Sequence, residues 1–348
     1  LFSAVTAPAP VVQSLTSTSG DGTYGVGDTI DVTATFDKAV DFTASGGTLQ
    51  AALSNGETVT LASADASGQT AFSGSYTVQE AETDSGDLSV ASLSLQGGAS
   101  LVAGDDGVPA VLDLPASQNL ADNQDIVVDA NTPSPAAPDV TAASDSGTSD
   151  SDNLTNDTTP TIQGSIEAGA IVDVRVGGSS FGTATADGSG DWSFTFDAGD
   201  LSEGANTVDV IASDAVNTSP DSDDLTITLD TTGPTAAADS DTVGEDAGST
   251  AMASAVANDT GVSGVTPVMS VEGSGGNVAA AVAGSQGGLF TVNADGTATF
   301  DPNGAFETLA AGDSQATAVD VAVQDAAGNT ATATYTVTVT GMNDAPSG

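Results

Sequence analysis

Residues 225–234 read Leu225-Thr226-Ile227-Thr228-Leu229-Asp230-Thr231-Thr232-Gly233-Pro234, a strand pattern that closes on a carboxylate and a proline. Apolar and hydroxyl side chains alternate over its first five positions, which is typical of a half-buried strand in an antiparallel sheet. A similar phrase occurs earlier, where the run from Asp125 to Val128 leads into Asp129-Ala130-Asn131-Thr132-Pro133. Asp129 and Asp230 lie 101 positions apart, which is about the length of one small β-sandwich. The phrase therefore predicts the boundary between consecutive β-domains.

Alternating runs of this kind recur along the whole chain. Trp192-Ser193-Phe194-Thr195-Phe196 and Tyr335-Thr336-Val337-Thr338-Val339 are two further examples. Segments rich in Gly, Asp and Asn separate the runs, as expected for turns, and no amphipathic helix is evident. The sequence predicts an all-β fold of three tandem antiparallel β-sandwich domains in an extended rod, with domains at 1–132, 133–232 and 233–348. The predicted strands of the first two domains are 11–16, 29–36, 48–53, 58–62, 72–78, 88–95, 161–166, 171–176, 192–196, 207–212 and 225–229.

The charge balance restricts the partners of the chain. Its 348 residues include 48 acidic side chains and only two basic ones, Lys38 and Arg175, which gives a formal net charge of -46. Nucleic acids and anionic membranes are recognised through basic patches, so neither is expected as a partner. No apolar run is long enough to span a bilayer, so direct membrane insertion is not expected. So acidic a surface predicts cations as ligands, since self-repulsion otherwise opposes a compact state.

Missing residue types exclude several kinds of chemistry. The chain has no cysteine and no histidine, which excludes disulfides, thiolate metal sites, the usual zinc sites and Ser-His-Asp triads. Paired carboxylates could in principle hydrolyse a glycoside, but any acidic loop offers two carboxyls at the required spacing. Trp192, the only tryptophan, alternates with Phe194 and Phe196 and is predicted to be a core residue rather than a sugar platform. We predict no enzymatic activity.

The acidic residues cluster with Asn, Ser, Thr and Gly in predicted loops, where they could supply the six to eight oxygen ligands that Ca²⁺ requires. Each single aspartate could equally be a solvated loop residue, and no cluster matches the EF-hand pattern. The clusters beside the domain-closing phrase favour calcium. For the first junction the candidate ligands are Asp129, Asp145, Asp150, Asp152, Asn156 and Asp157. For the second they are Asp230, Asp239, Asp241, Glu245 and Asp246, with Asp214 from the late turn of the second domain. Weaker candidates in the third domain are Asp259, Asp325 and Asn329, and Asn343 and Asp344 are the candidates for a further junction downstream.

Motifs in each domain resemble known repeats of giant bacterial surface proteins. The second domain contains Asp152-Asn153-Leu154-Thr155-Asn156-Asp157-Thr158-Thr159-Pro160, a middle segment from Gly182 to Thr195, and a late Asp214-Ala215-Val216-Asn217-Thr218-Ser219. It resembles the bacterial Ig-like repeats of type I-secreted (RTX-type) adhesins, although Val216 replaces the usual small residue or Gly pair. The run from Asp21 to Ile30 in the first domain resembles a bacterial Ig-like repeat of very large surface proteins.

The third domain carries several short motifs in a fixed order, among them Val256-Ala257-Asn258-Asp259, Asp295-Gly296-Thr297 and Val337-Thr338-Val339-Thr340-Gly341. It is similar to the VCBS or cadherin-like repeat of the same proteins. These resemblances imply immunoglobulin- or cadherin-like sandwiches that form the extender of a large, secreted, cell-surface adhesin or surface filament of bacteria. They imply neighbouring repeats of the same protein as partners, and the carboxylate clusters predict calcium as the ion that stiffens the interdomain linkers. Two alternatives stay open: a module that binds a glycan, ice or a protein, and a self-assembling sheath or filament subunit in which other copies are partners.

Overall fold

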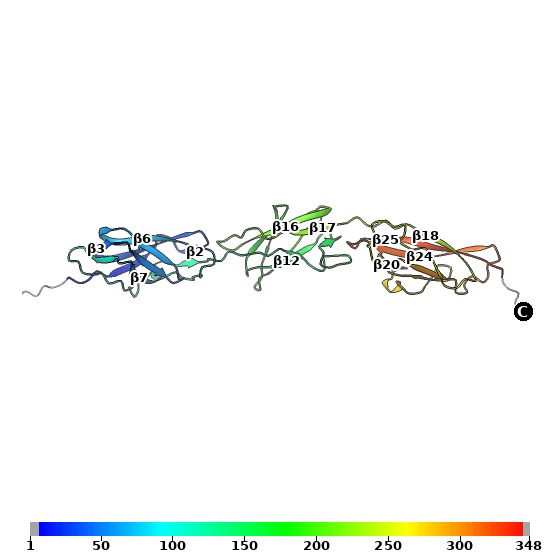
Figure 1. The fold of residues 1–348 in the computed structure, drawn as a ribbon, viewed down its shortest axis with the longest axis horizontal. Helices are drawn as coiled ribbons and strands as arrows, with labels where there is room; N and C mark the ends of the chain where they lie inside the picture. Colours follow the sequence, from blue (N-terminus) through cyan, green and yellow to red (C-terminus); the bar gives the residue numbers. More distant parts are fainter. Residues whose placement is uncertain (1–6, 344–348) are drawn as a thin grey trace, which may run out of the picture.

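The computed structural model describes residues 7–343, and it consists of three β-rich bodies that follow one another along a straight line (Figure 1). Each body has its own cluster of buried apolar side chains. Unit 1 has its core between Val12 and Ala130, unit 2 between Val140 and Leu229, and unit 3 between Val243 and Val339. The prediction of an all-β fold built from sandwiches is confirmed. No helix among residues 7–343 has the length and apolarity needed to cross a membrane.

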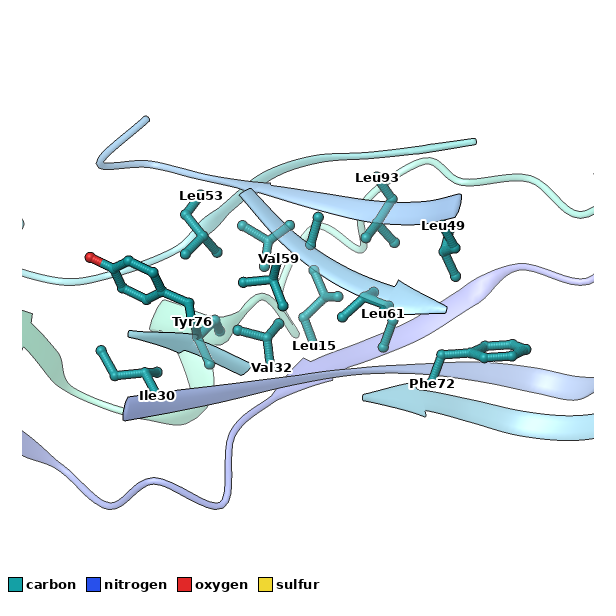
Figure 2. Close-up of a cluster of buried hydrophobic side chains, with 14 of the residues drawn as sticks. Leu15, Ile30, Val32, Leu49, Leu53, Val59, Leu61, Phe72, Tyr76 and Leu93 are labelled. Carbon is teal, nitrogen blue, oxygen red and sulfur yellow. The ribbon is translucent and has the colours of Figure 1, made fainter. Parts of the chain in front are cut away.

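Unit 1 is a sandwich of two antiparallel sheets. Apolar side chains alternate along its strands, and Figure 2 shows Leu15, Ile30, Val32 and Val59 meeting between the sheets. The one-turn helix α1 (Leu120–Asn123) starts at Asn119, whose side chain accepts the Leu120 backbone N–H. One sheet contains β1 (Val12–Thr16), β3 (Thr29–Thr43), β6 (Ala66–Thr77) and β8 (Ser100–Ala103), the other contains β4 (Thr48–Leu53), β5 (Thr58–Ala62) and β7 (Val90–Gln96), and β2 (Gly22–Tyr24) pairs with β9 (Ile126–Val128).

Unit 2 has a smaller sheet and a larger one. The smaller sheet carries Trp192, which is only 5% exposed and lies directly over Gly164, where any side chain would collide with the indole. The prediction that Trp192 is a core residue is therefore confirmed. The smaller sheet contains β10 (Asp139–Val140), β12 (Thr161–Ser165) and β15 (Asp191–Thr195), and the larger contains β11 (Leu154–Thr155), β17 (Leu225–Leu229), β16 (Gly204–Ser213), β13 (Ile171–Val176) and β14 (Ser179–Thr185).

Unit 3 is also a two-sheet sandwich. Its core includes Phe290, which packs edge-on against Phe300 with 4.7 Å between ring centroids and lies tilted against Tyr335. One sheet contains β18 (Asp239–Gly244), β25 (Thr330–Thr340), β24 (Ser314–Gln324) and β20 (Val268–Val271). The other contains β19 (Thr250–Ala251), β23 (Ala298–Asp301), β22 (Leu289–Val292) and β21 (Val282–Ala283), and a 3-10 turn, η1 (Gly275–Asn277), follows β20.

Strand direction decides at which end of a unit each loop lies. In unit 2, β11 pairs in parallel with the end of β17, so the loop before β11 lies beside the linker to unit 3. In unit 3, β18 runs parallel to β25 from Asp239, opposite Tyr335, to Gly244, opposite Thr340. A strand of six residues rises about 20 Å. The end of β18 is therefore carried away from the junction with unit 2 toward the opposite end of unit 3.

Candidate functional site

The candidate sites lie where one unit meets the next. We define junction 1 as the linker 129–133 with its surroundings and junction 2 as the linker 230–234 with its surroundings. The linker of junction 1 follows β9, the last strand of unit 1, and the linker of junction 2 follows β17, the last strand of unit 2. Side chains of the flanking units hold both linkers. Carboxylates surround each of them.

At junction 1 the structure brings together carboxylates from both units. Asp84 and Asp129 come from unit 1, and Glu167 and Asp214 come from unit 2. Burial raises the pKa of Asp129, and the nearby Asp214 and Asp84 carboxylates raise it further. Burial also raises the pKa of Glu167, and the nearby carboxylates of Asp129, Asp214 and Asp84 raise it further. A pocket of about 380 Å³ opens between Asp84, Asp129 and Glu167. Four carboxylates thus repel one another where the two units meet.

Two of these four residues were not predicted from the sequence. Asp84 accepts hydrogen bonds from the Ala130 backbone N–H at 2.9 Å and from the Asn131 side chain at 2.7 Å, which ties it to the linker. Glu167 lies in the turn after β12 of unit 2. No local motif distinguishes either residue from an ordinary loop acid, and only the fold places them beside Asp129.

A glutamate of the preceding unit holds the linker at both junctions. Glu80 accepts hydrogen bonds from the backbone N–H of Thr132 at 3.1 Å and from its hydroxyl at 2.5 Å. Glu203 accepts the same two bonds from Thr231, at 3.1 and 2.9 Å. The Thr231 hydroxyl is the main cause of a lowered pKa of Glu203. Both linkers are therefore anchored by a threonine-to-glutamate contact, but at different positions: three residues after Asp129 in the first and one residue after Asp230 in the second.

The acidic loop 142–153 lies at junction 2, not at junction 1 as the sequence analysis expected. The Ser146 hydroxyl donates to the Ala327 carbonyl of unit 3 at 2.7 Å, and the Thr148 backbone N–H donates to the Ala326 carbonyl at 3.2 Å. The grouping of Asp145, Asp150, Asp152, Asn156 and Asp157 with Asp129 was therefore wrong. The reason is that the segment crosses the unit along β10 before the loop begins.

Asp145 is the most enclosed carboxylate of this loop, since only 3% of the residue is exposed. Its Oδ2 accepts the Asn153 backbone N–H at 3.0 Å, whereas its Oδ1 and the Oδ1 of Asn153 are buried and have no hydrogen-bond partner. Burial raises the pKa of Asp145, and the Asp152 and Asp150 carboxylates raise it further. A pocket of about 510 Å³ adjoins the residue and is lined also by Ser146 and Asp150.

The remaining members of the predicted sets are dispersed. Asp214 belongs to junction 1 and not to junction 2. Asp157 is engaged in a local turn, where it accepts the backbone N–H and hydroxyl of Thr159 at 2.9 and 3.1 Å. Asn156 accepts the Ser146 hydroxyl at 2.8 Å, so it lies at junction 2 with the loop of Asp145 and not at junction 1, where it was expected.

At junction 2 itself lie Asp230, whose Oδ1 accepts the Thr232 N–H at 3.0 Å, and Asp325, which is bonded to Asn329 of its own turn. Asp241 accepts the Tyr335 hydroxyl and the Ala253 N–H, both at 2.7 Å, so one of its oxygens is committed within unit 3.

Three acidic residues of unit 3 gather just beyond the linker, where Thr235 pairs with Thr260. Burial raises the pKa of Asp239, with added contributions from Asp259 and Asp241, so these three carboxylates are neighbours. Asp259 also accepts the Ala237 N–H at 2.8 Å.

Glu245 and Asp246 lie at the opposite end of unit 3, which corrects their assignment to junction 2. Glu245 is 2% exposed, its Oε1 accepts the Met342 N–H at 2.7 Å, and its Oε2 has no partner. Asn343 is exposed near the same end. Asp344 lies outside the described residues.

The donor chemistry of both junctions is restricted to oxygen. Among residues 7–343, no three acidic side chains have the spacing that would hold a metal ion by themselves. Asp145 and Glu245 nevertheless each present one buried carboxylate oxygen without a partner, in corresponding places near the C-terminal ends of units 2 and 3. Carboxylate, amide and backbone oxygens are the ligands of hard cations such as Ca²⁺. The residues present therefore fit such an ion in chemical type.

Comparisons with known proteins bear on units 2 and 3. Residues 131–231 match the family model of the bacterial Ig-like domain, and residues 230–339 match that of the surface adhesin CshA repetitive domain. The predicted resemblance to repeats of bacterial surface adhesins is thereby confirmed. A search of curated proteins finds no match to the chain.

Several solved structures are similar in part. One comes from a study of host cell surface retention of a 1.5-MDa bacterial ice-binding adhesin; it is 18% identical, the match covers 97% of this chain and 100% of that one, and the TM-score is 0.42. The BSP domain of a biofilm-associated protein is 14% identical over 98% of this chain and 67% of its own, with a TM-score of 0.24. Drosophila N-cadherin EC1-4 is 13% identical over 95% and 76%, with a TM-score of 0.26.

Proposed function

We propose that this chain is an extender segment of a large bacterial cell-surface adhesin, stiffened by calcium ions bound at or beside its domain junctions. The observation that carries the extender role is the direct succession of a bacterial Ig-like domain and a surface-adhesin repeat in one straight row of sandwiches. A row of this shape suits the task of holding a binding domain at a distance from the cell. Each sandwich buries its apolar side chains between its sheets, and the pocket between units 1 and 2 is lined by the carboxylates of Asp84, Asp129 and Glu167.

Calcium would act on charges that the fold has placed too close together. At junction 1, Asp129 and Asp84 of unit 1 face Asp214 and Glu167 of unit 2, so like charges oppose the contact between the units. A divalent cation among them would turn that repulsion into a bridge. At junction 2, the free Oδ1 of Asp145 offers one ligand, and Asp150 and Asp152 lie close enough to influence its pKa. The ion would supply positive charge, and the protein would supply the oxygens.

Calcium sites of this kind would contribute measurably to the stability of each unit. Extracellular calcium modules bind with dissociation constants of about 10⁻⁴ to 10⁻³ M. A site held at 100 times its dissociation constant adds about 2.7 kcal/mol to the free energy of unfolding. The total for a domain is only about 5–15 kcal/mol. Occupied junctions would therefore raise the melting temperature measurably and would narrow the range of angles between units.

Small-angle scattering and thermal unfolding of the whole chain test this function. We expect a rod with a sharply defined maximum dimension and a raised melting temperature in about 10 mM CaCl₂, and a lower melting temperature with a broader distance distribution in EDTA. A sample in NaCl of equal ionic strength is the control, because a chain of net charge -46 gains from screening alone. Identical scattering and melting in calcium and in the sodium control would refute the calcium part of the proposal.

A further inference from the structure

The same kind of turn reaches across both junctions. In unit 2 the turn between β16 and β17 begins Asp214-Ala215-Val216-Asn217, and in unit 3 the turn between β24 and β25 reads Asp325-Ala326-Ala327-Gly328-Asn329. Each turn is closed by its aspartate. Asp214 Oδ1 accepts the Asn217 N–H at 2.7 Å, and Asp325 Oδ1 accepts the Asn329 N–H at 2.9 Å. The asparagine is thereby fixed at the tip, where it faces the preceding linker.

Asn217 contacts the linker and unit 1 at the same time. Its Nδ2 donates to the carbonyl oxygens of Asp129 at 3.3 Å and Asn131 at 3.2 Å. Its Oδ1 accepts the Val26 backbone N–H of unit 1 at 2.8 Å. The residue is only 3% exposed, so these bonds are shielded from water. One side chain of unit 2 therefore satisfies three backbone groups that belong to unit 1 and the linker.

Unit 1 has a matching recess at Gly25. A Cβ at that position would lie 2.6 Å from the Asn217 Oδ1 and 3.0 Å from the Val216 Cβ, closer than side chains tolerate. At Gly20, in the same segment of unit 1, a Cβ would meet nothing within 4 Å. The absence of a side chain at Gly25 thus lets the turn of unit 2 seat against the backbone of unit 1.

Junction 2 repeats the arrangement with different residues. Asn329 Nδ2 donates to the Asp230 carbonyl oxygen at 2.8 Å. The recess is Gly147, where a Cβ would lie 2.0 Å from the Ala326 carbonyl oxygen, and Gly328 of the turn faces it closely. The turn of unit 3 is one residue longer than that of unit 2, and the glycine it packs against lies in a different loop. The length of the turn and the position of the glycine therefore both change between the two junctions.

We propose that Asn217 and Asn329 are the positioning residues of a clasp that sets the angle between successive units without metal. The asparagine at the tip of each Asp-closed turn hydrogen-bonds to the backbone of the preceding linker, and the turn packs against a glycine of the preceding unit. Calcium, in the function proposed above, acts on the carboxylates around the linker, whereas the clasp uses neutral amide and backbone groups. The contributions of calcium and of the clasp can be measured separately, so a result that refutes one does not refute the other.

Distances between spin labels across junction 1 test the clasp in the full chain. The chain has no cysteine, so Ser75→Cys in β6 and Ser193→Cys in β15, both exposed, give one label on each unit. In EDTA we expect Asn217→Ala to broaden the distance distribution, because losing three hydrogen bonds raises the undocked population by about tenfold or more. Gly25→Ala, which leaves Asn217 intact, should broaden it too, and Gly20→Ala is the matched control that should not.

The outcomes separate the clasp from the calcium sites. Fluorescence of the single Trp192 during unfolding verifies that unit 2 of each variant is folded. Distributions in EDTA as narrow for Asn217→Ala and Gly25→Ala as for the parent would overturn the clasp. The response of the parent distribution to calcium tests the proposed function independently, since it needs neither variant.

Discussion

Replacing Asp145 with asparagine should stabilise unit 2 in the absence of calcium and remove its response to calcium. The carboxylate is 3% exposed, one oxygen has no partner, and burial together with Asp152 and Asp150 raises its pKa. In Asp145→Asn, the remaining oxygen can still accept the Asn153 N–H, while the new amide group removes a buried charge. An unsatisfied buried polar group costs about 1–3 kcal/mol. We therefore expect a gain of about 1 kcal/mol in EDTA, which for about 100 residues corresponds to about 4–8 °C in melting temperature.

The same variant, Asp145→Asn, should lose most of the stabilisation that calcium gives to the parent. With calcium at about 100 times its dissociation constant, the parent gains about 2.7 kcal/mol, and a neutral amide at position 145 should forfeit most of it. Trp192 is the only tryptophan and lies in the core of unit 2, so its fluorescence during urea unfolding reports this unit alone. Asp223→Asn, at an exposed position of the same unit, removes the same charge and should change neither value much. A variant that is destabilised in EDTA and still gains fully from calcium would refute the reasoning.

Three further predictions concern pH and packing. The pKa of Asp129 and of Glu167 is raised, so the folded state binds protons at a pH where the unfolded chain has released them. In EDTA the melting temperature should therefore rise as the pH falls from about 7 to 5. A melting temperature that falls over this range would contradict the prediction. Burial raises the pKa of Asp31, but hydrogen bonds from Thr18 and Ser19 outweigh it and lower the pKa to about 2. Asp31→Asn should therefore cost about 1–2 kcal/mol at neutral pH, after allowance for partial exposure, and this difference should vanish as the pH falls from about 4 to below 2 in urea titrations. Phe290→Ala should cost about 3–5 kcal/mol in the calorimetric transition of unit 3, and an equal shift in the Trp192 signal would show that the units do not unfold separately.

Strands bounded by strong turn residues were predictable from the sequence. The predicted ranges 48–53, 58–62, 171–176 and 225–229 coincide with β4, β5, β13 and β17, because each is a short alternating run between turn-forming residues. β14 was missed, since Gly182 and its polar neighbours break the alternation. Gly182 lies under the Phe194 ring, where a Cβ would come within 2.7 Å, so this edge strand is selected by packing rather than by local pattern.

The grouping of the site residues could be predicted only in part. The Asp129 and Asp230 phrases do mark the two linkers. Which loops surround them depends on parallel pairings such as that of β11 with β17, and a single sequence contains no local signal for those. Asp214 and the loop of Asp145 were consequently exchanged between junctions, and Asp84 and Glu167 were not recognised.

The parallel pairings have a consequence for a chain under tension. In unit 3 the first strand, β18, lies beside the last strand, β25, over six residues and in the same direction. Pulling the two ends of the unit apart slides these strands past each other, so all of their hydrogen bonds are strained together instead of being unzipped one at a time. In unit 2 the first strand, β10, lies in the other sheet, and the parallel pairing with the last strand is that of β11 with β17, which spans two residues. We therefore expect unit 2 to yield at a lower force than unit 3, and so to absorb sudden pulls on the cell before its neighbour does.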